Sequence, residues 1–195
     1  MCISFFTFFY ISEEDQMKSA IRIMFVLVAL CSMLYAMDDS GIKITTIDPF
    51  KYVAIEMTGN YDQHSAAFST LTEAITKQSI EVDDMPFGIY WNNPTDTPEE
   101  ELKWEVGFKV DNDVTAEAPL VVKNWDFSTL ATFTYEGVFG GDDYNAAMGT
   151  FWNWLGQNGY QPIGPFMEMF ITIPEDAGDG MWKGKVEFYL PVQQI

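Results

Sequence analysis

The two halves of this chain contain the same kinds of segment in the same order, and this repetition limits the folds available to it. Each half has an apolar strand-like run ending in glycine, a helical stretch, and two further strand-like runs. These runs cover residues 51–59, 86–94 and 104–110 in the first half and residues 129–137, 166–174 and 186–192 in the second. Gly59 corresponds to Gly137, and Pro94 to Pro174.

Hydrophobic periodicity assigns structure to these segments. Apolar side chains recur at three- and four-residue spacing in two stretches, which predicts two amphipathic helices. Their apolar stripes are Ala67, Phe68, Leu71, Ala74 and Ile75, and Tyr144, Ala147, Met148, Phe151 and Leu155. The other runs alternate with a period of two and are bounded by Gly and Pro, as half-buried strands are. Each half is therefore predicted to be strand, helix, strand, strand.

We expect an α+β fold in which the duplicated unit forms one antiparallel sheet. Both helices would pack on one face, leaving a ligand cleft on the other. The two repeats are placed at about residues 43–110 and 120–192, joined by a linker at 111–119, within a single domain of residues 37–195.

Residues 1–36 differ in character from the rest and are predicted to be a signal peptide or N-terminal leader. Lys18 and Arg22 precede an apolar run over residues 23–36, which is shorter than the roughly 20 residues of a membrane span. The alternative is an uncleaved N-terminal membrane anchor. A start at Met17 would give a conventional signal peptide, and protein sequencing that found residues 1–16 would refute that start. The expected localisation is exported, either periplasmic or secreted.

Composition excludes several functions. With 10 basic and 29 acidic residues the net charge is −19, which disfavours nucleic acid and anionic membrane surfaces as partners. Both cysteines, Cys2 and Cys31, lie in the leader, so the mature domain has no disulfide or thiolate chemistry. No metal site or cofactor is expected. The only histidine, His64, follows Asp62 at the predicted start of a helix, where a solvated position is expected.

One acidic residue is placed differently from the others. Glu168 alternates with Phe166 and Phe170 in a strand whose other residues are apolar. A carboxylate there is expected to face a partly desolvated aromatic groove, where it would attract an organic cation through charge and cation–π contacts. The alternative is that Glu168 lies on a solvated face and has no function. Tyr90 is expected on the same side as Glu168, and Trp91 and Trp182 are candidates for the rim.

The ordered motifs resemble the GyrI-like small-molecule-binding domain, the effector-binding domain of multidrug-responsive transcription regulators. They include residues 135–139, the helix from Tyr144, residues 164–170 and residues 190–192, with weaker counterparts in the first half; the resemblance spans about residues 43–194. It implies a pseudo-twofold pair of units with a ligand cleft between them, and a glutamate in that cleft, here Glu168. A basic helix-turn-helix module is not expected beside the domain, so transcriptional control is not implied.

Three functions remain as hypotheses. The first is binding of a hydrophobic, cationic small molecule by Glu168, Tyr90, Phe166, Phe170, Trp91 and Trp182. The second is hydrolysis of strained, cyclopropane-type toxic natural products, with Glu168 as the catalytic acid or base. The third is a structural interaction domain whose open sheet face is covered by a partner. The protein is expected to be a monomer or a dimer.

Overall fold

The computed structural model describes residues 40–82, 85–111 and 113–195. The predicted leader at residues 1–36 and the predicted start at Met17 lie outside these ranges. Within the described ranges, no helix has the length and apolar character needed to cross a membrane.

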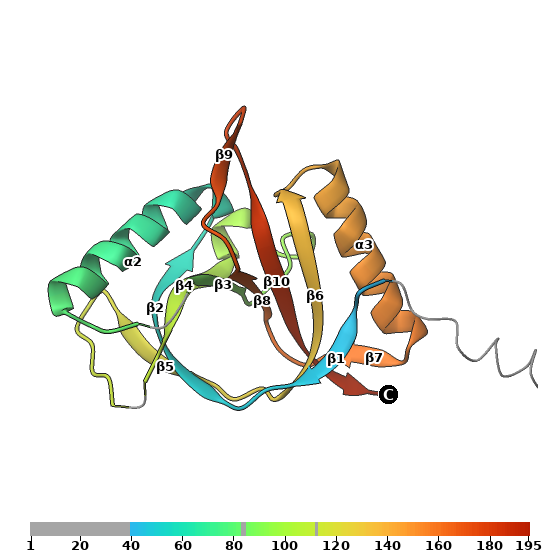
Figure 1. The fold of residues 1–195 in the computed structure, drawn as a ribbon, viewed down its shortest axis with the longest axis horizontal. Helices are drawn as coiled ribbons and strands as arrows, with labels where there is room; N and C mark the ends of the chain where they lie inside the picture. The colour runs from blue at the N-terminus through green and yellow to red at the C-terminus, as the bar shows by residue number, and fades with distance from the viewer. Residues whose placement is uncertain (1–39, 83–84, 112) are drawn as a thin grey trace, which may run out of the picture. The chain divides into compact units, whose positions relative to one another are not determined.

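The described part is an α+β domain, as predicted (Figure 1). Its strands are β1 (Lys43–Thr46), β2 (Phe50–Thr58), β3 (Phe87–Tyr90), β4 (Lys103–Val110), β5 (Val121–Trp125), β6 (Thr129–Val138), β7 (Tyr160–Pro162), β8 (Phe166–Phe170), β9 (Glu175–Gly178) and β10 (Met181–Gln194). Its helices are α2 (His64–Gln78) and α3 (Asp142–Gln157), with short 3-10 turns η1 (Tyr61–Gln63) and η2 (Glu99–Glu101). The order β2-α2-β3-β4 recurs as β6-α3-β8-β10, with β7 and β9 added.

All strand pairs in the sheet are antiparallel, and the strand order is β1-β6-β10-β8-β3-β4-β2-β5, with β7 and β9 both paired to β10. The two halves join at the centre, where β3 pairs with β8. They also exchange strands at the edges. β1, which precedes the first half's β2, pairs with β6 of the second half, whereas β5, which precedes β6, pairs with β2. Each half therefore completes the sheet of the other.

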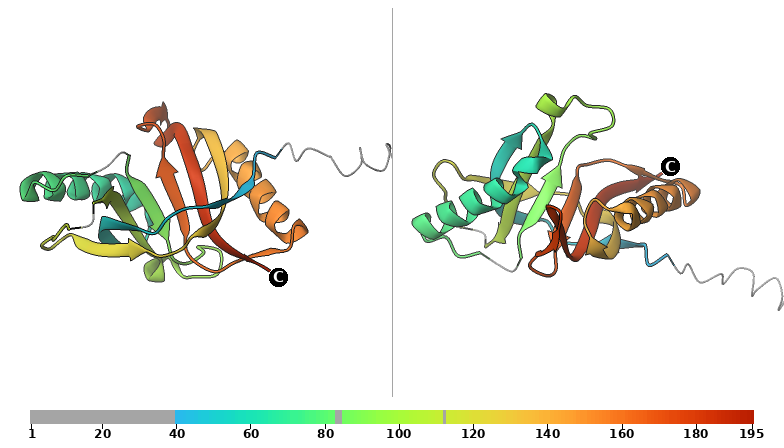
Figure 2. Two further views of the ribbon diagram at one scale, coloured as in Figure 1. Left: turned by 60° about the horizontal axis from the view of Figure 1, so that its bottom comes forward. Right: turned by 90° about the horizontal axis from the view of Figure 1, so that it is seen from above.

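Both helices pack on one face of this sheet, α2 over the first half and α3 over the second (Figures 1 and 2). The α2 stripe of Ala67, Leu71, Ala74 and Ile75 is buried against Val53, Ile55, Trp104 and Val106. The α3 residues Phe151 and Leu155 are buried against Ala131, Leu190 and Val192. Near-complete burial of these side chains is the main favourable term in folding.

The sheet face opposite the helices is more covered than the sequence suggested. Its strands contribute Tyr52, Ala54, Phe87, Ile89, Leu130 and Met167 to a third core, each 2% exposed or less. The segments around Ile47 and Trp125 pack against these side chains. These segments belong to the exchanged edges, which the six predicted strands did not include. This covering buries the part of the face formed by these side chains, on the side where the sequence predicted the ligand cleft.

Candidate functional site

Glu168 is the third residue of β8 and lies on the face that carries both helices. Its backbone neighbours across the sheet are Gly88 of β3 and Phe188 of β10. Directly opposed residues in antiparallel strands point to the same side. Phe188 packs against Tyr144 of α3, so Glu168 shares the side occupied by that helix. The carboxylate therefore lies between the two halves on the helix-bearing face.

Each half supplies one tyrosine hydroxyl to this carboxylate. Tyr90, from β3, donates a hydrogen bond to Oε2 at 3.0 Å. Tyr144, from the first turn of α3, donates a short hydrogen bond to Oε1. Gly88 leaves the space that the first contact needs, because a Cβ atom at that position would lie 2.7 Å from the Tyr90 hydroxyl oxygen. The second contact depends on α3 beginning close to β8.

Burial sets the protonation behaviour of these three groups. Desolvation raises the pKa of Glu168, and the hydrogen bonds from Tyr144 and Tyr90 partly oppose this because they stabilise the ionised form. Burial and the nearby Glu168 charge raise the pKa of both Tyr90 and Tyr144 above the ordinary value. The two tyrosines therefore remain protonated donors at neutral pH.

Aromatic rings surround the carboxylate. Phe166 and Phe170 flank Glu168 on β8, and both are half-buried. The Phe170 ring lies 5.7 Å from Phe68 of α2 and 6.0 Å from Phe139, while the Phe166 ring lies 6.4 Å from Tyr90. The first half thus contributes Phe68 and Tyr90 to the same site as the second half's phenylalanines. Such rings can form cation–π contacts with a bound cation.

His64 lies in this site, although the sequence suggested a solvated position. Its ring centroid is 4.4 Å from that of Trp104, and its Nε2 is 3.1 Å from the Tyr90 hydroxyl. Desolvation lowers its pKa, and a hydrogen bond to the Tyr61 backbone and the charge of Asp62 partly oppose that shift. The burial of His64 was hard to predict from the sequence, because the residues that contact it, Trp104 and Tyr90, come from two strands that lie far from it along the chain.

The structure brings Glu168, Tyr90, Phe166 and Phe170 together, whereas Trp91, a candidate for the rim, lies on the opposite face of the sheet. Trp91 comes directly after Tyr90, the last residue of β3. It points to the opposite face, where its indole Nε1 donates to Glu105 Oε1 at 2.5 Å. Trp182 pairs with Asp176 in the β9–β10 hairpin and is 48% exposed.

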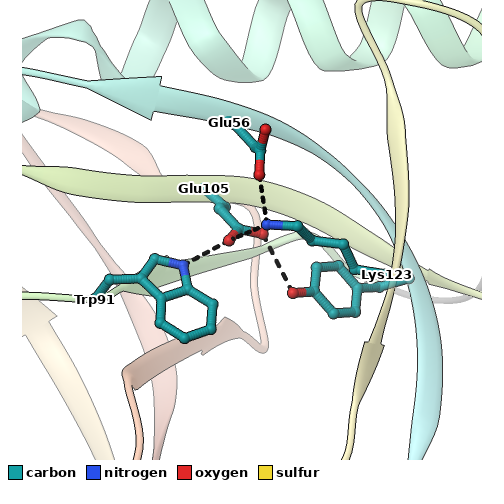
Figure 3. Close-up of polar contacts among 5 residues, drawn as sticks. Glu56, Trp91, Glu105 and Lys123 are labelled. Atoms are coloured by element: carbon teal, nitrogen blue, oxygen red, sulfur yellow. Dashed lines mark hydrogen bonds and ion pairs between the residues drawn. The ribbon is translucent and has the colours of Figure 1, made fainter.

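Trp91 belongs to a second polar cluster on that opposite face (Figure 3). The Lys123 Nζ lies 2.7 Å from Glu105 Oε1 and 2.6 Å from Glu56 Oε1, and Tyr52 donates to Glu105 Oε2 at 3.2 Å. Glu105 is only 2% exposed, so these contacts compensate a buried charge. Glu56 therefore lies on the far side of the sheet from Glu168 and is not a second carboxylate for that site.

Two surface cavities lie away from Glu168. One, of about 420 Å³, is lined by residues that include Phe127, Ile163 and Gln193, and the other, of about 550 Å³, by residues that include Glu81, Asp111 and Asp113. Neither lining includes the Glu168 carboxylate, whose two oxygens face Tyr90 and Tyr144. A ligand reaching the carboxylate must therefore compete with these hydroxyl groups.

Solved structures share this fold at low sequence identity. The EcmrR C-terminal domain aligns with a TM-score of 0.64 and 14% identity, over 79% of this chain and 98% of that one. A hydrolase from Listeria innocua aligns with a TM-score of 0.59 and 12% identity, over 83% of this chain and 96% of that one. The structure of SAV2435 bound to tetraphenylphosphonium aligns with a TM-score of 0.53 and 15% identity, over 78% of this chain and 93% of that one.

No curated protein matches the chain by sequence. A family model, described as the GyrI-like small molecule binding domain, matches residues 41–193. The match covers nearly all of the described part of the chain, including both helices and the Glu168 site.

Proposed function

Because the chain belongs to the GyrI-like small molecule binding domain family, we propose that it binds a lipophilic organic cation at Glu168. The observation that carries this proposal is the position of the Glu168 carboxylate, which is held between the two halves by Tyr90 and Tyr144 among half-buried rings. Burial of a carboxylate is unfavourable unless the charge is compensated. Neutral tyrosine hydroxyls solvate this charge without cancelling it, so a cation can still provide the compensation.

The surrounding rings set the preferred chemistry of the ligand. Phe166, Phe170, Phe139 and Phe68 present apolar surface, which favours a cation with aromatic or alkyl substituents over a small hydrated ion. SAV2435, which shares the fold, is bound to tetraphenylphosphonium, a cation of this class. The net charge of −19 would also draw cations toward the protein by long-range attraction.

Binding is tested with tetraphenylphosphonium and the full chain by isothermal titration calorimetry at pH 8. Triphenylphosphine oxide is the control ligand, since it has similar rings and no charge. We expect the cation to bind more tightly than the neutral compound. Glu168→Gln should weaken cation binding by about tenfold or more, which corresponds to about 1.4 kcal/mol, and should leave the weak binding of the neutral compound nearly unchanged.

The matched control variant is Glu187→Gln. Glu187 lies on the adjacent strand β10, is opposite Met169, and accepts a hydrogen bond from the Tyr189 hydroxyl at 2.8 Å. This variant removes the same charge from a carboxylate–tyrosine pair on the other face of the sheet. It should bind the cation as the wild type does. Equal affinity of the wild type and Glu168→Gln for the cation would exclude Glu168 as its counter-ion.

A hydrolase is the second candidate, and the raised pKa of Glu168 favours it because an acid–base catalyst works best with a pKa near the working pH. The hydrolase from Listeria innocua shares the fold. In this alternative, Glu168 accepts a proton from water as the water oxygen bonds to a cyclopropane carbon. The strained C–C bond at that carbon breaks, and its electron pair passes into an electron-accepting group of the substrate, which then takes up a proton. Glu168→Gln would then bind such a substrate without turning it over, whereas absence of turnover by the wild type would leave binding as the function.

A further inference from the structure

We propose that His64 is a positioning residue for the Glu168 site: its neutral imidazole orients the Tyr90 hydroxyl toward the carboxylate, and its imidazolium opposes cation binding there. The inference rests on the proposed function, because it concerns how the same site responds to pH. It makes His64 the residue through which acidification would release a bound cation.

A chain of hydrogen bonds links α2 to α3 through the Glu168 carboxylate. His64 Nε2 lies 3.1 Å from the Tyr90 hydroxyl oxygen, and that hydroxyl lies 3.0 Å from Glu168 Oε2. Tyr144 completes the chain at the other carboxylate oxygen, Oε1. His64, the first residue of α2, is thus separated from the Glu168 charge by a single side chain.

The number of available hydrogens determines which group donates in each of these hydrogen bonds. An ionised carboxylate can only accept, so the one hydroxyl proton of Tyr90 is donated to Glu168. The Tyr90 oxygen then accepts from His64, whose Nε2 must carry a hydrogen. The neutral imidazole in this arrangement is the Nε2–H tautomer, whose Nδ1 carries no hydrogen. Only the imidazolium can also donate to the Tyr61 backbone, which is why that contact raises the pKa of His64. A side chain at position 64 without a donor would leave the Tyr90 hydroxyl free to rotate away from the carboxylate.

The surroundings of His64 disfavour its charged form. The groups that face it are Tyr61 and Asp62 on η1, Tyr90 on β3 and Trp104 on β4, with Glu168 and Tyr144 beyond Tyr90. Desolvation lowers the pKa of His64 despite the hydrogen bond to the Tyr61 backbone and the charge of Asp62. The start of a helix also disfavours a cation, since the helix dipole is positive there. His64 is therefore neutral at pH 8 and becomes charged only below its ordinary pKa near 6.5.

Protonation of His64 places a positive charge beside a site that holds a cation. The imidazolium and the ligand then compete for the same negative charge, so each weakens the binding of the other. By linkage, bound cation must lower the pKa of His64 by the same coupling free energy that protonation removes from cation binding. A coupling of ordinary size changes the affinity by about fivefold or more.

The binding test uses tetraphenylphosphonium, whose charge does not depend on pH, with the full chain. Affinities are measured from pH 8 to one unit below the pKa of His64. His64→Gln retains an amide donor for Tyr90 but cannot be protonated, so its loss of affinity between pH 8 and the lowest pH should be about fivefold smaller than that of the wild type. His64→Phe, which has no donor, should bind more weakly than His64→Gln at pH 8. Parallel pH profiles for the wild type and His64→Gln would overturn the proposal, as would full affinity of His64→Phe at pH 8.

A second measurement does not depend on the ligand. His64 is the only histidine in the sequence, so its imidazole proton resonance can be followed by NMR without assignment. Glu168→Gln removes a negative charge that favours the imidazolium and should lower the pKa of His64, whereas Glu187→Gln should leave it unchanged. An unchanged pKa in Glu168→Gln would show that the two groups are not coupled. Failure of the wild type to bind the cation at pH 8, with the coupling intact, would refute the proposed function alone.

Discussion

At the scale of single residues, the Glu168 site combines a predictable part and an unpredictable part. Strand alternation predicted that Phe166, Glu168 and Phe170 share one face, and the structure agrees. The same period of two also separates Tyr90 from Trp91, so the opposite orientation of Trp91 follows from the rule that placed Tyr90. The position of His64 could not be predicted in this way, because a polar residue at a helix start is usually solvated and its burial depends on tertiary packing.

The pKa of Glu168 leads to a prediction about stability. The folded state raises this pKa by burial, whereas the unfolded chain keeps the ordinary value near 4.5. The folded state therefore holds the proton more tightly, and its ionisation costs stability as pH rises from 4.5 through the raised pKa. Glu168→Gln should have a larger free energy of unfolding than the wild type at pH 7, and the difference should shrink as the pH falls to 4.5.

Urea denaturation of both proteins at several pH values measures this difference, and Glu187→Gln serves as the control for loss of a single charge. A Glu168→Gln variant that is less stable than the wild type at pH 7 would contradict the prediction. It would mean that the tyrosine hydrogen bonds to the carboxylate outweigh its desolvation.

At the scale of elements, the helices and longer strands were predictable and the short strands were not. The two apolar stripes predicted both helices, and the structure confirms them. In α2, the predicted Ala67, Leu71, Ala74 and Ile75 are buried. The strands β1, β5, β7 and β9 were not among those predicted from the sequence. The partners of β1 and β5 lie in the opposite half of the chain, so no local pattern marks their pairing. These edge segments also help to cover the face on which the cleft was predicted.

Two glycines in different elements should respond oppositely to alanine. A Cβ at Gly107 of β4 would lie 2.7 Å from the Val53 backbone oxygen, so Gly107→Ala should destabilise the sheet by about 2 kcal/mol. A Cβ at Gly149 of α3 would meet nothing within 4 Å, so Gly149→Ala should stabilise the protein by about 1 kcal/mol through helix propensity. Thermal unfolding of the two variants checks both signs, and equal effects would contradict the packing described here.

At the scale of the whole described domain, the exchanged edge strands join the halves more firmly than the central β3–β8 pair would alone. β1 is bound to the second half and β5 to the first, so separation of the halves would break three strand pairings. The Glu168 site lies across this junction and takes one tyrosine from each side. Its geometry therefore depends on both halves being folded together.

We accordingly expect the domain to unfold in one cooperative transition. All six tryptophans lie beyond residue 90: Trp91, Trp104 and Trp125 precede β6, and Trp152, Trp154 and Trp182 follow it. Fluorescence thus reports on both halves. Urea transitions followed by tryptophan fluorescence and by far-ultraviolet circular dichroism should coincide, whereas two separated transitions would show that the halves unfold independently.

The exchange of edge strands also affects how the chain can fold while it is being synthesised. β1 leaves the ribosome early, but its partner β6 is made only after the whole first half and β5. Throughout that interval the nascent first half lacks a partner for β1, and until β5 emerges the outer edge of β2 is open. Unpaired strand edges are prone to aggregation. Completion of the sheet is therefore a late event in synthesis, and a translational pause before β6 would prolong the exposure of these edges.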